Sequence, residues 1–468
     1  MKAPAGARAC AFQVLRGVEL GRGFGKDLLD DPAALAGLDR RDAALVRELV
    51  YGVERHRRTL KHLLRGLSHV AVEKINPPVR IQLYLGLYQL LFLEKVPPHA
   101  AVAETVELAR GKATRGFVNA ILRAAARLVE SRGTGEPPPG VPPTRVLPTR
   151  PGAHLVLADP VLPDPVADPV RAHGVRHSYP DELVARWLAR LGPEPTRAAL
   201  EAGNEVPPLF LRANRRRIAR DALAARLRQE GVETEPAATP DGLRVAAGAH
   251  AHPAELESFR EGLFTVQDET AQRAVLALDP QPGERILDLC AAPGGKATQI
   301  AEALGERGEV VAVDVAPDRL ALVEESARRL GLAGVRTVAA DVLAPGATGS
   351  LAAPGPFDRV LADVPCSNTG VLRRRVEARW RFRPADLDGL TTLQQRLLGA
   401  AADAVRPGGL VVYSTCSVED EEDRGLVDRF LADPRGAGFT LEGDERILPR
   451  PGGGDGGYIA RLRRLAPA

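Results

Sequence analysis

Two cysteines follow two apolar stretches that are expected to be strands of one sheet. Cys366 comes just after the predicted strand 357–363, in the run Asp363-Val-Pro-Cys-Ser367, and Cys416 lies near the end of the predicted strand 409–417, in the run Tyr413-Ser-Thr-Cys-Ser417. Open α/β sheets bind ligands at the carboxyl ends of their strands. Both thiols are therefore expected at one ligand site, whereas Cys10 is interpreted as a small apolar core residue.

A loop of small residues predicts the ligand. The run Ile286-Leu-Asp-Leu289 is expected to be a strand and residues 297–304 a helix. Small residues allow close approach of a ligand, and a helix N-terminus offers free N–H groups. Ala follows the lysine where a phosphate-binding P-loop needs Ser or Thr, and G-x-G-x-x-G is absent, so an adenosine ligand without pyrophosphate is favoured over ATP or NAD. The alternative is an ordinary tight turn. The loop consists of Cys290, Ala291, Ala292, Pro293, Gly294, Gly295 and Lys296.

Two further acids end predicted strands. Asp314, 26 residues beyond Asp288, ends the second strand and can accept hydrogen bonds from both ribose hydroxyls of an adenosine ligand. Asp341 ends the third strand, 335–341, and can accept from the adenine amino group. Either acid could instead be a routine helix N-cap.

A thiolate beside a methyl donor indicates a definite reaction. Addition of the thiolate to C6 of a pyrimidine makes C5 nucleophilic enough to attack a methyl sulfonium. Asp363 can hold the amidine edge of a cytosine, and a base must then remove the C5 proton before the sulfur leaves. The second cysteine could assist that release. The residues alone do not say which cysteine attacks.

The three motifs, 288–296, 363–367 and 413–417, together resemble motifs I, IV and VI of the RNA cytosine-C5 methyltransferases. The resemblance implies that Cys416 is the nucleophile and that Cys366 assists product release. It also implies that S-adenosylmethionine is bound by the loop 290–296 and by Asp314, Asp341 and Asp363. The predicted catalytic set is Cys416, Cys366, Asp363 and Lys296.

The rest of the chain resembles the RsmB branch of that family, the 16S rRNA methyltransferases with a NusB-like RNA-binding domain. Residues 264–272 resemble the entry to the catalytic domain, and 117–123 resemble the end of the helical domain. Residues 370–381 resemble the substrate-side loop, although Val376 stands where the family usually has Pro. The predicted substrate-binding residues are Arg373, Arg374 and Arg379 from this loop and Arg212 from an upstream strand exit, where a solvated charge run is the alternative.

The elements that position these residues divide the chain into four predicted parts. Residues 1–130 form an all-α bundle with 21 Lys and Arg against 13 Asp and Glu, a balance that suits an anionic partner such as RNA. Residues 131–177 form a proline-rich linker, 178–263 a small α+β RNA-binding module, and 264–468 a Rossmann-like class I methyltransferase domain with a doubly wound sheet. The helices expected in the bundle cover 9–20, 40–53, 59–67, 79–93 and 100–108.

Composition excludes several classes of protein. The 468 residues are 44% hydrophobic and 26% charged, with no run of 18 apolar residues, so we expect a cytoplasmic protein rather than a membrane protein. The four cysteines form no C-x-x-C pair, which argues against a zinc site or a disulfide framework. No metal is expected, and the protein is expected to be a monomer.

We therefore expect an S-adenosylmethionine-dependent enzyme that makes 5-methylcytosine in 16S rRNA, on naked RNA or before complete 30S assembly, because the base must be unstacked. One alternative is the same chemistry on tRNA. A second is an RNA-binding assembly or antitermination factor with a vestigial catalytic fold, which the intact catalytic set opposes. A third, an NAD-dependent oxidoreductase, lacks its dinucleotide fingerprint.

Overall fold

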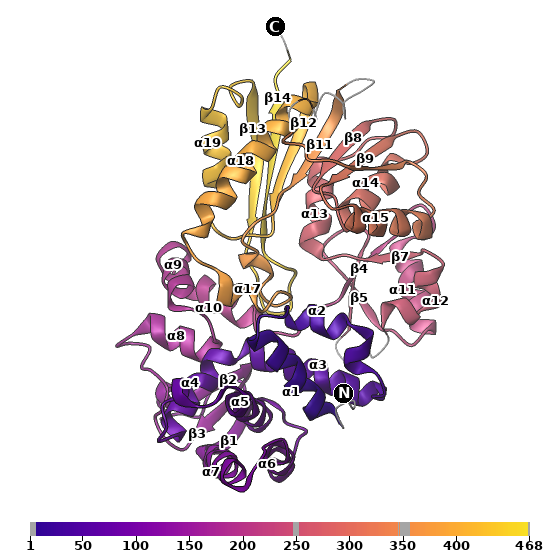
Figure 1. Cartoon of the computed structure of the whole chain (residues 1–468). Coiled ribbons are helices and arrows are strands. Elements are labelled where there is room, and N and C mark those ends of the chain that lie inside the picture. Colours follow the sequence, from indigo (N-terminus) through magenta and orange to yellow (C-terminus); the bar gives the residue numbers. More distant parts are fainter. Residues whose placement is uncertain (1–5, 247–251, 345, 347–355, 467–468) are drawn as a thin grey trace. The chain divides into compact units, whose positions relative to one another are not determined.

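The chain forms two compact units (Figure 1). The computed structural model describes residues 6–246, 252–344, 346 and 356–466. Unit 1 comprises Met1–Glu205 together with Arg373–Arg381, and unit 2 comprises Val206–Leu372 and Phe382–Ala468. No helix in the described ranges is long and apolar enough to cross a membrane.

Unit 1 begins with a helical bundle, as expected. Helix α7 shows why: Val118, Ile121, Leu122 and Ala125 are all buried at the i, i+3, i+4, i+7 spacing of one helix face. The helices expected in this region are confirmed, with ends shifted by a few residues. Helix α2 is a further helix that was not expected. The helices are α1 (Ala7–Glu19), α2 (Gly25–Asp30), α3 (Arg40–Arg55), α4 (Arg57–Leu67), α5 (Pro77–Phe92), α6 (Pro98–Glu107) and α7 (Lys112–Leu128).

The linker predicted at 131–177 is wrong. This stretch folds as part of a three-stranded antiparallel sheet in the order β1-β3-β2, followed by a helix. The central strand is apolar and fully buried, and Pro148 lies in an edge strand, where a missing N–H donor is tolerated. The elements are β1 (Val129–Thr134), β2 (Val146–Arg150), β3 (Ala153–Leu157) and α8 (Pro169–His177).

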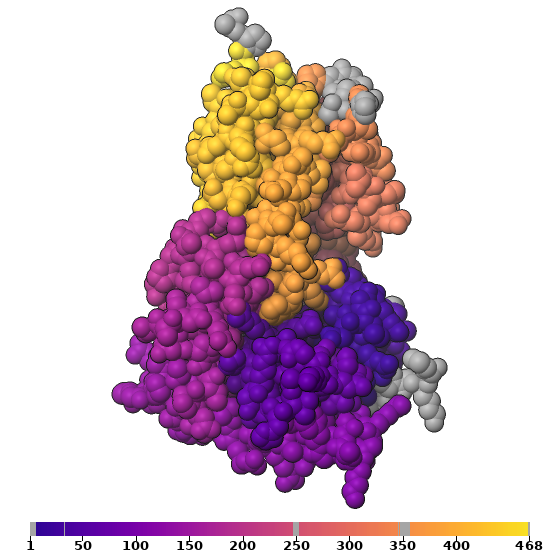
Figure 2. Space-filling view, turned by 60° about the vertical axis from the view of Figure 1, so that its left-hand side comes forward, coloured from indigo at the N-terminus to yellow at the C-terminus, as the bar shows by residue number. Residues whose placement is uncertain are grey.

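Three more helices complete unit 1. Two follow α8 directly, and the third comes from the distant segment 373–381. Figure 2 shows the magenta stretch around residues 150–205 forming a continuous surface with the indigo and violet residues of the first helices. These helices are α9 (Asp181–Leu191), α10 (Pro193–Ala202) and α17 (Ala378–Arg381).

Unit 2 opens with a small α+β module. Its four strands are antiparallel and lie in the order β5-β6-β4-β7. The last of them was expected to open the catalytic domain, but it pairs with β4, so this sheet extends past the boundary predicted at 263/264. The elements are β4 (Phe210–Ala213), α11 (Arg220–Gln229), β5 (Thr234–Pro236), β6 (Gly242–Val245), α12 (Glu257–Arg260) and β7 (Phe264–Val266).

A seven-stranded sheet in the order β10-β9-β8-β11-β12-β14-β13 forms the centre of unit 2. The first five strands in that order are parallel, and β14 runs antiparallel to both of its neighbours. The strands are β8 (Arg285–Leu289), β9 (Glu309–Asp314), β10 (Val335–Ala339), β11 (Phe357–Asp363), β12 (Val405–Thr415), β13 (Phe439–Ile447) and β14 (Gly457–Arg464).

Helices cover both faces of this sheet. Alternate residues of a strand point to opposite faces. In β9, Val311 packs in a cluster with α18 and α19, whereas Val310 packs with α13, α14 and α15. These helices are α13 (Glu269–Leu278), α14 (Gly295–Leu304), α15 (Pro317–Leu330), α18 (Asp386–Ala404) and α19 (Arg424–Ala432) (Figure 1).

Candidate active site

The two cysteines at the strand ends lie in contact. The parallel register of β11 and β12 pairs Asp363 with Ser414, which brings the following loops together. The Sγ atoms of Cys366 and Cys416 are 2.9 Å apart. The thiol of Cys416 also donates a hydrogen bond to Oδ1 of Asn368 at 3.3 Å. The expectation that both thiols share one site is therefore confirmed.

The environments of the two thiols differ. Cys366 is buried, whereas Cys416 is half-buried. The hydrogen bond to Cys416, together with burial, raises the pKa of Cys366 well above its ordinary value. Cys366 therefore keeps its proton at neutral pH and can donate it to the neighbouring sulfur.

Asp363 connects the cysteine loops to the small-residue loop. Its Oδ2 accepts a hydrogen bond from Nζ of Lys296 at 2.6 Å, and its Oδ1 accepts one from the Ser414 hydroxyl at 2.7 Å. Burial alone would lower the pKa of Lys296, but the charge and hydrogen bond of Asp363 raise it overall. The lysine is therefore an ammonium at neutral pH that fixes the orientation of the carboxylate.

A buried glutamate that the sequence reasoning missed joins the two cysteine loops. Glu422 accepts hydrogen bonds from the backbone N–H of Ser367 at 2.8 Å and from the hydroxyl of Ser417 at 2.5 Å. Gln394 of α18 donates a further hydrogen bond to it at 2.9 Å. Each serine directly follows one of the cysteines, so one carboxylate sets the spacing of both thiols.

The acidic run that follows Cys416 precedes the next helix instead of opening it, and this explains the glutamate's position. Helix α19 begins at Arg424, because the backbone of 419–423 turns to direct the Glu422 side chain inward. The acidic run Glu419-Asp-Glu-Glu-Asp423 after the second cysteine was the available signal. A run of acids at this point ordinarily indicates an exposed helix start, so the pattern was misleading.

The small-residue loop has a conformation that requires glycine. Gly294 has φ +102°, and a Cβ atom there would lie 3.0 Å from Cα of Val323. Helix α14 starts at the next residue, so its first N–H groups face the loop. Lys296, in the first turn, makes the bond to Asp363 described above.

The strand-end acids differ in accessibility. Asp314 is buried, and its carboxylate accepts hydrogen bonds from the backbone N–H groups of Ala292 at 3.2 Å and Ala316 at 3.0 Å. Asp341 is exposed, lies beyond the end of β10, and accepts a bond from the Leu343 N–H at 2.9 Å. Both acids thus use part of their hydrogen-bonding capacity within the protein, and their ligand contacts stay a prediction.

Asp288 is a second residue that was not predicted as part of the site. It is fully buried at the end of β8, and neither carboxylate oxygen has a hydrogen-bond partner among the described residues. Burial, with the nearby charge of Asp363, raises its pKa well above the ordinary value. A buried acid without a protein partner points to a polar group that the protein itself does not supply.

The prediction that Arg212 contacts RNA is wrong. Its side chain is 1% exposed and forms an ion pair with Glu302, with Nη2 2.7 Å from Oε1. The strand exit where Arg212 lies was expected to be at the surface, but α14 covers it. The sequence could not show this, because the partner is 90 residues away.

Two of the three predicted substrate-loop arginines are also buried. Arg379 donates to the carbonyl of Gly203 at 2.7 Å, and its guanidinium lies 4.1 Å from the centre of the Tyr179 ring. Arg373 is 2% exposed. The structure therefore contradicts direct RNA contacts by Arg373 and Arg379, which anchor 373–381 within unit 1. Arg374 is half-buried, and its role stays a prediction.

No group of three or more His, Cys, Asp or Glu residues in the described part of the chain is placed to hold a metal ion.

Three family models match successive parts of the chain. The NusB family matches residues 5–127, the ferredoxin-like domain of RsmF/B-like methyltransferases matches 179–252, and 16S rRNA methyltransferase RsmB/F matches 275–463. The chain is 36% identical over 444 residues to ribosomal RNA small subunit methyltransferase B of Sodalis glossinidius, covering 92% of each chain. It is 34% identical over 480 residues to the protein of that name from Erwinia tasmaniensis, covering 99% of each.

The chain belongs to the RsmB/F methyltransferase family. The predicted fold class is confirmed: a NusB domain comes first, then a small ferredoxin-like domain, then a methyltransferase domain with a mixed sheet. The solved structure of PH0851 has the same fold, with a TM-score of 0.71, 21% identity and coverage of 97% of this chain and 98% of that one. In the present chain, residues 128–178 lie between the segments that match the NusB model and the ferredoxin-like model.

Proposed function

We propose that this protein transfers a methyl group from S-adenosylmethionine to C5 of a cytosine in 16S rRNA, through a covalent adduct of Cys416 with C6 of the base. The observation that carries the proposal is the 2.9 Å contact between the two sulfurs beside the Lys296–Asp363 ion pair. One thiol is needed to attack the base and a second group to assist its release, and few other reactions call for both.

The residues of unit 2 fit an adenosine ligand with a charged amino-acid tail. The chemistry of the donor set supports this: Asp288 offers a buried carboxyl group without a partner among the described residues, and Asp314 lies at the end of the next strand in the sheet. The N–H groups of the α14 first turn complete the cradle. These residues would hold S-adenosylmethionine, which supplies an electrophilic methyl group on a sulfonium.

The protein's own residues account for activation of the base. Addition of the Cys416 sulfur to C6 makes C5 of the ring nucleophilic, the state in which a pyrimidine carbon can be methylated. Asp363, whose orientation Lys296 and Ser414 fix, would hold the amino edge of the cytosine. After methyl transfer a base must remove the C5 proton, so that the bond between C6 and the Cys416 sulfur breaks by elimination. Cys366, which its raised pKa keeps protonated, can donate its proton to the departing sulfur.

The substrate RNA must present the cytosine out of its stack, because C6 of a stacked base is not accessible to a thiol in a loop. We infer that naked or partly assembled 16S rRNA is preferred to the finished 30S subunit. The basic balance of residues 1–130 supports contacts to the RNA backbone.

The test is methyl transfer from labelled S-adenosylmethionine to naked 16S rRNA, to 30S subunits and to tRNA, followed by mapping of the labelled base. Label on C5 of one cytosine of naked 16S rRNA is the expected result. Label on tRNA alone would contradict 16S rRNA as the substrate but would agree with the proposed reaction. Binding of the cofactor without label on any RNA would overturn the proposal in favour of an RNA-binding factor.

A further inference from the structure

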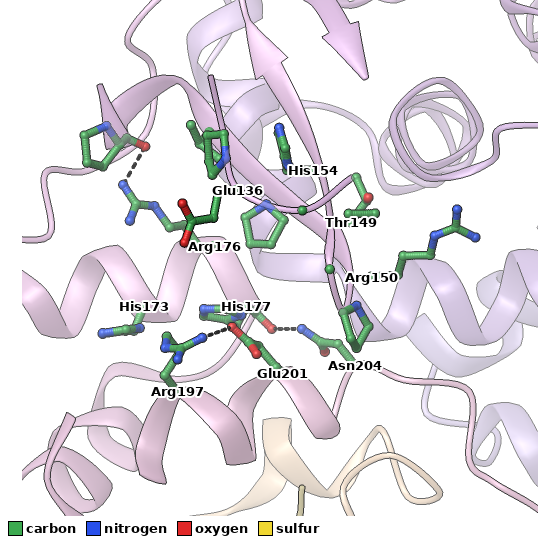
Figure 3. Close-up of a pocket in the computed structure, with 18 of the residues that line it drawn as sticks. Glu136, Thr149, Arg150, His154, His173, Arg176, His177, Arg197, Glu201 and Asn204 are labelled. Carbon is green, nitrogen blue, oxygen red and sulfur yellow. Dashed lines mark hydrogen bonds and ion pairs between the residues drawn. The ribbon is translucent and has the colours of Figure 1, made fainter. Parts of the chain in front are cut away.

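Unit 1 contains a pocket that the proposed function does not use. It has a volume of 440 Å³ and lies between the β1–β3 sheet and helices α8 and α10 (Figure 3). This volume falls within the range of about 300–1,000 Å³ that is usual for small-molecule sites. Part of its wall, residues 135–154, lies in the stretch between the matched family models.

Imidazole side chains supply the buried polar groups of the pocket. His154 and His177 line the pocket and are 6% and 5% exposed. In His56, which stacks on Phe92, Nδ1 is buried and has no partner within the described ranges. The Nδ1 atom of His56 therefore leaves hydrogen-bonding capacity that the described residues do not fill.

His56 and His177 are uncharged at neutral pH. Burial lowers the pKa of His177 to about 3 and that of His56 well below its ordinary value. A neutral imidazole both donates and accepts a hydrogen bond, and its flat face can stack on another ring. The inner pocket thus suits a neutral planar ligand with donors and acceptors rather than an anion or a metal ion.

Cationic side chains lie at the more exposed part of the lining. The side chains of Arg150 and Arg197 are 62% and 49% exposed, and both form ion pairs: Arg150 with Glu94 at 3.1 Å, and Arg197 with Glu194 at 2.7 Å and with Glu201 at 3.0 Å. Arg176 also lines the pocket and lies on α8, the helix that carries His177. In Figure 3, Glu136 lies between Arg176 and Thr149. Proteins bind an unstacked base by stacking it on aromatic rings such as imidazole. Guanidinium groups nearer the solvent can contact the attached phosphate.

We propose that this pocket binds one unstacked nucleotide of a single-stranded segment of the substrate RNA, with the base against the imidazoles and the phosphate near Arg150 and Arg197. The identity of the ligand as RNA rests on the proposed function. The site itself is separate from the cysteine site, since all its residues belong to unit 1.

The first test fills the pocket and measures RNA binding without cofactor. Thr149 lines the pocket from β2 and is half-buried, so Thr149→Trp would occupy space needed by the base. The matched control is Val70→Trp, at an exposed position of the same unit outside the pocket. We expect Thr149→Trp to weaken binding of naked 16S rRNA about tenfold, the loss that follows from one missing stacked base, and Val70→Trp to leave it unchanged.

The second test needs no variant, so it holds even if Thr149→Trp does not fold. The full wild-type chain is irradiated with 16S rRNA that carries 4-thiouridine, and the crosslinked peptides are identified. Crosslinks within 146–154 or 173–177 support the site. Absence of crosslinks from both segments, or equal RNA affinity of folded Thr149→Trp and wild type, would overturn it. If the crosslinks map to the pocket but the protein methylates no rRNA, the nucleotide site is supported and the proposed function is overturned.

Discussion

The carboxylate of Glu422 holds Ser367 by two hydrogen bonds, one from the backbone N–H and one from the hydroxyl. Because Cys366 directly precedes Ser367, this contact fixes the cysteine that is proposed to assist release. The side chain is fully buried.

Glu422→Gln is expected to slow methyl transfer about tenfold or more while leaving cofactor affinity unchanged. The side-chain NH2 of the glutamine would face the N–H and hydroxyl groups that now donate hydrogen bonds to the carboxylate. A hydrogen bond to a charged group contributes about 1.5–3 kcal/mol to stability. Single-turnover rates and calorimetric titration of S-adenosylmethionine measure the two quantities. The control is Asp428→Asn, an exposed acid of α19. A Gln variant with the wild-type rate would show that the carboxylate does not position the loop.

Cys416→Ala is expected to abolish turnover and covalent capture of RNA, since the attacking sulfur is gone. Cys366→Ala should instead accumulate a protein–RNA adduct that survives denaturing electrophoresis, because the group that assists release is missing. Cys10→Ala, in the core of unit 1, is the control for loss of a buried thiol. Adduct accumulation in Cys416→Ala with none in Cys366→Ala would reverse the two roles.

Arg212→Ala is expected to destabilise the protein without reducing the RNA affinity of the folded fraction. Removing one partner of a buried ion pair costs about 3–5 kcal/mol, because Glu302 would stay buried without its partner. Arg215→Ala, at an exposed neighbouring site, should cost less than about 1 kcal/mol. Denaturant unfolding and RNA titration make the comparison. A stable Arg212→Ala protein with weakened RNA binding would restore the surface role that the burial excludes.

Deprotonation of the buried Glu54 carboxyl is expected to lower the stability of unit 1 as the pH rises. Burial, against the opposing charge of Arg57, raises its pKa from 4.5 to about 7. The folded state therefore binds more protons than the unfolded state between these values, and stability falls as the pH rises through them. The shift corresponds to roughly 3 kcal/mol above pH 7.

Glu54→Gln should accordingly raise the thermal unfolding temperature at pH 8 and change it much less at pH 5. Glu107→Gln, at an exposed position of α6, should shift the temperature at neither pH. An equal shift for Glu54→Gln at both pH values would show that its carboxyl does not titrate with folding.

The parts of the site that could be predicted share one property: the side chain and the element that places it are adjacent in the sequence. Cys366, Cys416 and Lys296 each lie within a few residues of an apolar strand, and parallel strands bring such ends together. Glu422 and Arg212 could not be placed in this way. Their partners, Ser367 and Glu302, are 55 and 90 residues away, and only the packed structure decides which charged residue is inside.

The β1–β3 sheet was missed for a different reason. Eleven prolines among residues 131–170 break the alternation that identifies strands. The structure shows that Leu147 of the edge strand is buried opposite Leu155 of the central strand, so cross-strand pairs stabilise a sheet whose local pattern indicates a linker.

The inclusion of 373–381 in unit 1 has a consequence for dissecting the protein. The polypeptide passes between the units at three junctions, 205/206, 372/373 and 381/382. A fragment beginning at Val206 would retain Arg379 but lose Gly203 and Tyr179, its partners. In such a fragment the guanidinium of Arg379 would lose these groups, which help to enclose it in the full chain. A clean catalytic fragment therefore needs the nine-residue segment 373–381 replaced by a short polar turn as well as the upstream cut.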